Sequence, residues 1–255
     1  MKTIASKLLS ANTCVTAHFT TRHGGVSMAP FNFSNLAFHV GDNPVSVVQN
    51  HQLLAQKIGY NLTDLIHMRQ IHSDRVLIAD ETMNFKTPPE CDALISNRFD
   101  VPLMVMSADC TPILIFDPIH NAIGAIHAGR AGALNAILPK TLSSMHRHYG
   151  TSADDVQIIL GPSIHGCCYE INEAIALEVK SQGYGEALRR EENQVFLDVN
   201  TILLLQLKES GVSAERIEVI DECTACNSGD YFSYRADTQH TGRIAGVILL
   251  RSSLS

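Results

Sequence analysis

The fold of this chain depends on residues 110–127, which read CTPILIFDPIHNAIGAIH. Two apolar runs suited to β-strands, residues 112–116 and 121–126, flank the tetrapeptide 117–120. Asp117 and Pro118 occupy the first two positions of this tetrapeptide, where a type I turn prefers Asp and Pro. The stretch therefore predicts a β-hairpin with its turn centred between Pro118 and Ile119.

This register places Cys110 opposite His127, with Cβ atoms roughly 5 Å apart. A thiolate and an imidazole at that spacing can bind one zinc ion, because Zn–S and Zn–N bonds are about 2.3 and 2.0 Å long. His72 follows another strand-like run, residues 65–71, and is the candidate for a third ligand. Three protein ligands leave a fourth position open, as in catalytic zinc sites. Pro112 cannot donate to a ladder, so an edge strand or a bulge is expected there, and a bulge would turn Cys110 away from His127.

Composition excludes several classes of protein. The 255 residues are 45% hydrophobic and 18% charged, which is typical of a globular protein with a sizeable core. A net charge of -7 and the lack of a long Lys/Arg run argue against nucleic-acid binding. The longest apolar stretch, residues 101–116, is too short and too polar to span a membrane. Residues 1–10 lack the apolar core of a signal peptide, so we expect a cytoplasmic protein with reduced cysteines. We also expect a monomer or a small homo-oligomer.

The order of predicted elements favours a single α+β domain over residues 1–255, with mixed β-sheet flanked by helices. Asn43 can cap a helix that has Pro44 in its first turn and ends at Gly59. Further helices are expected at 131–149 with a kink at Pro139, at 172–179 and at 198–209. The strand-like runs are residues 15–20, 65–71, 75–79, 93–96, 102–107, 112–116, 122–126, 156–160, 216–220 and 244–250. Because they do not alternate regularly with the helices, a doubly wound fold is disfavoured.

Polar segments lie at the ends of these strands, where binding sites are commonly built. They are residues 21–27, 70–72, 107–110, 127–132, 161–170 and 231–235. In this order they resemble the YfiH family, also called laccase-domain or multicopper polyphenol oxidoreductase proteins, from Thr21 to about Ile248. The family motifs Q-V-H, D-C-x-P and H-A-G match residues 70–72, 109–112 and 127–129.

Members of that family are similar to zinc-dependent purine nucleoside phosphorylases that also act as adenosine deaminases. The resemblance implies zinc bound by His72, Cys110 and His127, and phosphorolysis of adenosine, inosine or methylthioadenosine. Zinc in such a site brings the pKa of bound water to about 7, and zinc deaminases combine it with a carboxylate acid/base. Asp109, beside Cys110 in the predicted catalytic pair, is the candidate carboxylate. The equally weighted alternative is that Asp109 orients a metal-bound histidine.

Phosphorolysis also requires fixed cations and backbone donors that hold phosphate near the ribose. Arg22, Arg130 and Arg235 are the candidates, each weighed against a solvated surface arginine. Ser27 and Gln70 complete the predicted substrate-binding set. The chain departs from the family pattern H-A-G-W-R-G, because Arg-Ala stands at 130–131 and no tryptophan occurs anywhere.

Three other readings remain open. A copper-dependent polyphenol oxidoreductase would need many His-x-His pairs to hold a copper cluster, and His146 and His148 form the only such pair in the sequence. A single Cu²⁺ in the His/Cys/His site is still compatible with the sequence. A metal-free hydrolase could use Cys110 as nucleophile and His127 as base. A non-catalytic metal-binding or partner-binding protein is the third.

The remaining cysteines predict no metal site of their own. Cys223 and Cys226 form a lone C-x-x-C, whereas a structural zinc needs a second pair, and none stands at suitable sequence spacing. Cys167 and Cys168 are expected to be buried, inert thiols near the site.

Overall fold

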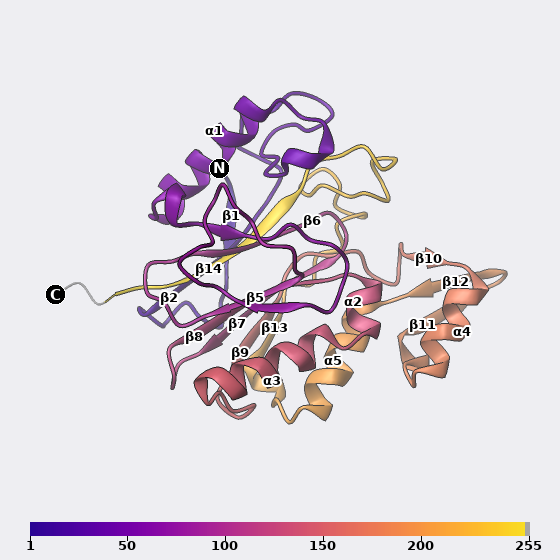
Figure 1. The fold of residues 1–255 in the computed structure, drawn as a ribbon. Helices are drawn as coiled ribbons and strands as arrows, with labels where there is room; N and C mark the ends of the chain where they lie inside the picture. Colours follow the sequence, from indigo (N-terminus) through magenta and orange to yellow (C-terminus); the bar gives the residue numbers. More distant parts are fainter. Residues whose placement is uncertain (253–255) are drawn as a thin grey trace.

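The computed structural model describes residues 1–252 and has an α+β fold built on three β-sheets (Figure 1). The five-stranded sheet has the order β1 (Thr3–Ala5), β2 (Val15–Thr20), β14 (Ile244–Leu250), β6 (Leu103–Ser107) and β3 (Ile66–His67). The six-stranded sheet has the order β13 (Ile217–Val219), β9 (Gln157–Leu160), β7 (Thr111–Asp117), β8 (Ala122–Ala128), β5 (Ala93–Ser96) and β4 (Val76–Ile78). A small sheet contains β10 (Glu170–Ile171), β12 (Gln194–Leu197) and β11 (Leu188–Glu191). Both larger sheets combine parallel and antiparallel pairs, as expected for a mixed sheet.

The helices are α1 (Pro44–Ile58), α2 (Arg130–Leu134), α3 (Ile137–Tyr149), α4 (Glu173–Ser181) and α5 (Val199–Glu209). The predicted boundaries of α1 are confirmed: the Asn43 side chain accepts a hydrogen bond from the Val45 N–H, and Gly59 ends the helix with φ 83°. Asn172 and Asp198 cap α4 and α5 in the same way. No helix within residues 1–252 is both long and apolar enough to cross a bilayer.

The two large sheets pack face to face, and helices cover their outer faces (Figure 1). On β14, Val247 belongs to the hydrophobic cluster that includes Leu54 of α1, while Ile248 belongs to the cluster between the sheets with Phe116 of β7. The opposite face of the six-stranded sheet packs against α2, α3 and α5. Because both faces of the central strands β6, β7, β8 and β14 are buried, these strands are largely apolar instead of alternating with polar residues.

The predicted hairpin forms as β7 and β8, but its turn lies one residue further along the chain. Asp117 pairs with Ala122, which leaves a four-residue loop, 118–121, in place of the predicted two-residue centre. Asn121 closes this loop in the left-handed region, with φ 49°. The loop is therefore longer than the Asp-Pro signal alone implied.

The predicted pairing of Cys110 with His127 is consequently wrong by two residues, and His127 opposes Pro112. Side chains alternate with a period of two, so the shift keeps Cys110 on the same face, as a diagonal neighbour of His127. The prediction of an edge or bulge at Pro112 is also wrong. Pro112 is the second residue of a central strand, and pairing with β9 begins only at Ile113, so the missing N–H falls where the ladder starts.

The predicted helix 131–149 is two helices, α2 and α3, separated at residues 135 and 136. Ala136 takes a left-handed conformation with φ 58°. The ring of Pro139 conflicts with a helical carbonyl four residues earlier, at Asn135, so the helix restarts and Pro139 lies in its first turn. The predicted strand 65–71 contracts to β3.

Candidate metal centre and its cavity

His72, Cys110 and His127 converge at one end of the β7–β8 hairpin. One ligand atom from each lies within 4.8 Å of the other two. The rings of His72 and His127 meet edge to face, with centroids 4.8 Å apart. His127 is buried in β8, Cys110 precedes β7 and is half-buried, and His72 is exposed on the loop after β3. The three side chains are close enough for a single metal ion to contact them all.

Gly129 leaves room for the thiol. A Cβ at this position would lie 2.9 Å from Cys110 Sγ and 3.5 Å from His72 Cδ2. Such a contact is shorter than real Cβ contacts, so any larger residue would displace Cys110. Glycine in the H-A-G segment is thus required by the packing of the centre.

Asp92 organises the centre, and sequence reasoning missed it. Its buried carboxylate accepts hydrogen bonds from His127 Nδ1 at 2.9 Å and from the His72 N–H at 3.0 Å. It also accepts bonds from the N–H groups of Ile71 and Ser73 and from Ser73 Oγ. By holding Nδ1 of His127, Asp92 directs Nε2 toward Cys110 and His72, a common arrangement around metal-bound histidines. The available signal was an acidic residue between Cys91 and the apolar strand β5.

Cys110, His127 and Asp92 stabilise one another's charged forms. Burial raises the pKa of the Cys110 thiol, but the charge of His127 and hydrogen bonds from His127 and His72 outweigh it and lower the pKa to about 6. Burial lowers the pKa of His127, while the Cys110 charge and the hydrogen bond to Asp92 raise it to about 9. A thiolate is therefore present near neutral pH, and thiolate is the form of cysteine that binds metals.

This donor set fits a borderline-soft transition metal. One thiolate and two imidazoles suit Zn²⁺, and they also suit copper. The three residues leave one side open, because all of them line a cavity of about 520 Å³. A metal with three protein ligands and one free position is the arrangement found in catalytic zinc sites.

The predicted arginines at the cavity are Arg130 and Arg235, and Gln70 lines it as well. Arg130 begins α2 and pairs with Glu178 at 3.0 Å. The Arg235 guanidinium donates to the Glu170 carbonyl at 3.0 Å and lies 5.3 Å from the centre of a tyrosine ring. The amide of Gln70 is bound on both sides by the backbone of Met106, so its main effect is to hold the loop that carries His72.

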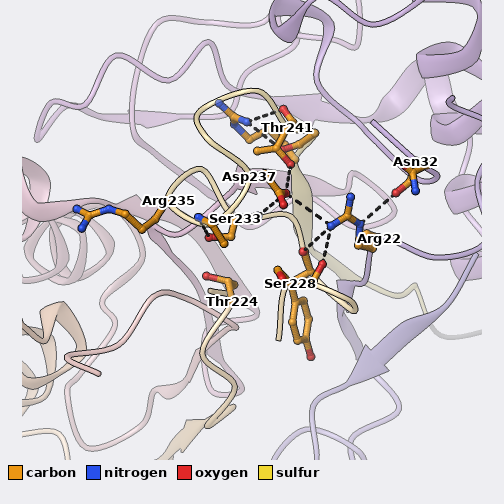
Figure 2. A network of polar contacts seen from close by, with 12 residues as sticks. Arg22, Asn32, Thr224, Ser228, Ser233, Arg235, Asp237 and Thr241 are labelled. Atoms are coloured by element: carbon orange, nitrogen blue, oxygen red, sulfur yellow. Dashed lines mark hydrogen bonds and ion pairs between the residues drawn. The ribbon is translucent and has the colours of Figure 1, made fainter. Parts of the chain in front are cut away.

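Arg22 and Ser27 lie outside this cavity. Figure 2 shows the Arg22 guanidinium directed toward Asn32, Ser228 and Asp237, while Arg235 points away from this group. Arg22 donates to the carbonyls of Asn32 and Ser228 and lies 3.6 Å from the Asp237 carboxylate. The hydroxyl of Ser27 is buried and donates to Asp42 at 2.6 Å. Both side chains stabilise loops.

Asp109 lines the cavity, but its carboxylate bonds to neither histidine. Thr224 Oγ1 donates to one oxygen at 2.7 Å, and the Arg235 N–H donates to the other at 2.7 Å. Asp109 has φ 89° and is 9% exposed. The role of orienting a centre histidine, which was the alternative for Asp109, belongs to Asp92 in this structure.

Arg243 and His39 also line the cavity and were not predicted. Arg243 precedes β14, and its guanidinium is 5.8 Å from the centre of the Tyr234 ring. Burial lowers its pKa, although the nearby Cys110 and Asp109 favour its charged form. Nothing in the sequence indicated that Arg243 lies near Cys110, because the two residues are far apart in the chain and meet only in the folded structure.

The fold and the centre define a class of α+β protein that is represented among solved structures. The crystal structure of YlmD from Geobacillus stearothermophilus superposes with a TM-score of 0.90 at 28% identity, covering 97% of this chain and 94% of that one. The crystal structure of Bacillus licheniformis protein YfiH superposes with a TM-score of 0.89 at 29% identity, covering 93% of each chain. The predicted α+β class is confirmed.

Residues 16–251 match the family described as multi-copper polyphenol oxidoreductase laccase, and the chain belongs to this family. The predicted YfiH resemblance is thereby confirmed. Among curated relatives, a purine nucleoside phosphorylase from Corynebacterium glutamicum is 37% identical over 233 residues, which are 91% of this chain and 93% of that protein. A purine nucleoside phosphorylase of Bacillus subtilis, YlmD, is 29% identical and covers 94% of this chain.

Proposed function

We propose that this protein is a zinc-dependent purine nucleoside phosphorylase that also deaminates adenosine. The names of its relatives suggest a purine nucleoside and phosphate as substrates. Adenosine, inosine and methylthioadenosine are our candidate nucleosides. The observation that carries this proposal is the opening of the His72, Cys110 and His127 cluster into a cavity that also holds several arginines.

The cavity has groups suited to each part of a nucleoside and phosphate. Its volume, about 520 Å³, lies within the range of small-molecule sites. Tyr169 and Tyr234 line it and offer aromatic faces on which a purine can stack. Arg235 and Arg243 supply fixed positive charge for phosphate, with bidentate donors that match its oxygens. The proposed phosphate ligands are therefore the arginines of the cavity, without Arg22.

In phosphorolysis, a phosphate oxygen forms a bond to C1′ of the ribose while the bond from C1′ to the purine nitrogen breaks. The purine leaves with the electron pair and takes up a proton, so the products are a free base and ribose 1-phosphate. Arg235 and Arg243 would hold the attacking phosphate against the ribose, which lowers the entropic part of the barrier. A zinc ion held by the three ligands would supply Lewis-acid activation.

Deamination of adenosine replaces the amino group at C6 by oxygen from water and releases ammonia. Proton transfer between the incoming water and the leaving ammonia requires a carboxylate acid/base. Asp109 is our candidate, because it lines the cavity beside Cys110. Its two oxygens accept hydrogen bonds from Thr224 Oγ1 and the Arg235 N–H, which fix the orientation of the carboxylate.

Two rival functions each have one supporting observation. The family description favours a copper-dependent polyphenol oxidoreductase, with Cu²⁺ in the same centre. The pairing of a Cys110 thiolate with a His127 imidazolium favours a metal-free hydrolase, since this ion pair is the usual state of a nucleophilic cysteine.

The test is an assay of adenosine and inosine, with and without phosphate, on protein purified without a metal-affinity step. We expect ribose 1-phosphate and free base only when phosphate is present, and loss of one zinc equivalent and of turnover in Cys110→Ala. Arg235→Ala should raise the KM for phosphate at least tenfold, whereas Arg98→Ala, at an arginine outside the cavity, should not. Zinc-loaded protein that releases no base with phosphate would refute the proposal, and phenol oxidation by copper-loaded protein would support the oxidase instead.

A further inference from the structure

A second group of potential metal ligands lies apart from the His72, Cys110 and His127 centre. The Sγ atoms of Cys167, Cys168, Cys223 and Cys226 all lie within 4.8 Å of one another. The C-x-x-C of residues 223–226 therefore has a second pair after all, supplied by the adjacent cysteines 167 and 168. None of the four lines the cavity described above. This cluster is independent of the proposed function.

The sulfur separations match a tetrahedral site. Cys226 Sγ lies 3.5 Å from Cys167 Sγ and 3.3 Å from Cys168 Sγ, and these last two are 3.7 Å apart. Four sulfurs bonded to one zinc at about 2.3 Å would be separated by ~3.8 Å along the edges of the tetrahedron. A disulfide would need sulfurs about 2.05 Å apart, and all four cysteines are free thiols.

We propose that Cys167, Cys168, Cys223 and Cys226 bind one zinc ion in a closed, structural tetrathiolate site. Four thiolate ligands leave no open position, so this ion would take no part in chemistry. Thiolate is the form of cysteine that binds zinc, so metal binding would release the thiol protons of the cluster.

The site would join two loops, one of which forms part of the wall of the cavity. Cys167 and Cys168 belong to the segment that contains Ile164 and Tyr169, both at the cavity. The loops are already aligned by two backbone hydrogen bonds, from the Ser163 N–H to the Glu222 carbonyl and from the Thr224 N–H to the Ser163 carbonyl. The metal would therefore add a second link between two loops that backbone hydrogen bonds already hold together.

The second loop also reaches the metal centre through Asp109. Thr224, between the two ligands of the C-x-x-C, donates its hydroxyl to Asp109 at 2.7 Å, and the other Asp109 oxygen accepts from the Arg235 N–H. Figure 2 shows Thr224 next to the loop that carries Ser233 and Arg235. Zinc at the four cysteines would thus fix the position of Arg235 without touching substrate.

The experiment measures zinc per chain on reduced protein purified without a metal-affinity tag. We expect two zinc ions in the wild type, one in Cys110→Ala, one in Cys226→Ser and none in the double variant. Cys14→Ser is the matched control, because Cys14 is exposed and lies in neither cluster, and should keep two. Cys226→His supplies another zinc ligand at the same position and should keep the second ion, which distinguishes loss of a ligand in Cys226→Ser from poor folding.

Cobalt substitution gives a readout that does not depend on activity. Cys110→Ala loaded with Co²⁺ should show the strong sulfur-to-cobalt charge-transfer absorption of tetrahedral thiolate coordination, and this should disappear in the double variant. In Cys226→Ser, limited proteolysis should cleave residues 221–240 at least tenfold faster. The proposal is overturned if Cys110→Ala contains no zinc, if the native protein carries a disulfide within the cluster, or if iron occupies it.

Discussion

Replacing Asp92 by Asn tests whether one buried carboxylate assembles the metal centre. The two oxygens of Asp92 accept five hydrogen bonds, of 2.7–3.2 Å, from the backbone of residues 71–73, from Ser73 Oγ and from His127 Nδ1. Asparagine keeps the size of the side chain, but it places an NH₂ group where one oxygen accepted bonds. At least one donor then faces another donor, and the carboxylate charge is lost.

The size of the effect follows from these bonds. Burial would raise the pKa of Asp92, but hydrogen bonds from His127 and Ser73 outweigh it and lower the pKa to about 2, so the substitution removes a full charge near neutral pH. A hydrogen bond to a charged group contributes about 1.5–3 kcal/mol, so we expect a loss of ~2–4 kcal/mol in the free energy of unfolding. Loss of a partner that orients a metal-bound histidine reduces metal affinity about 10–100-fold.

The assay is zinc titration against a chromophoric chelator, combined with urea unfolding, in the Cys226→Ser background so that a single site is measured. Asp117→Asn is the matched control, because Asp117 is also wholly buried and its carboxylate accepts bonds from Ile119 and His120 at the hairpin turn. It should lose stability but keep its zinc affinity. Zinc affinity of Asp92→Asn within twofold of its parent would refute the reasoning.

Three other expectations concern local features. Burial and the nearby His67 lower the pKa of His51 to about 3, so the folded state favours the neutral imidazole. This preference contributes stability that is complete above about pH 6.5 and is lost as the pH falls toward 3. Urea unfolding should therefore show ~2 kcal/mol less stability at about pH 5 from this group, and the loss should vanish in His51→Phe. Gly129→Ala should reduce zinc binding at the His/Cys/His centre at least tenfold by chelator titration, whereas Gly229→Ala, at a glycine with open space around it, should not. Asn43→Ala removes the cap of α1 and should cost about 1 kcal/mol in thermal or urea unfolding, with metal content unchanged.

The sequence predicted the boundaries of an element correctly where residues close together in the chain determine them. The capped helix α1 and the strand β14 have their predicted limits because Asn43, Gly59 and a long apolar run act over a few residues. The hairpin was predicted in kind but not in register, since Asn121 can adopt the left-handed conformation and extend the loop. His72, Cys110 and His127 still meet, because a shift of two residues preserves the face of a strand.

Contacts between distant segments explain what was missed. Asp92 bonds to His127 across 35 residues, and Cys168 meets Cys226 across 58, so no spacing rule within a motif could pair them. Arg22 resembled a phosphate ligand because a Gly-Gly turn follows it. Its actual partners, the carbonyls of Asn32 and Ser228, become visible only once the loops are folded together.

The central position of β14 has a consequence for biosynthesis. This strand lies between β2 and β6, and its Ala245 N–H bonds to the Thr20 hydroxyl 225 residues earlier. At synthesis rates of about 5–20 residues per second, β2 would wait roughly 11–45 s for its partner. During that interval β2 and β6 expose apolar strands with unpaired edges, which favour aggregation. The nascent chain is therefore expected to require chaperone protection until β14 has left the ribosome.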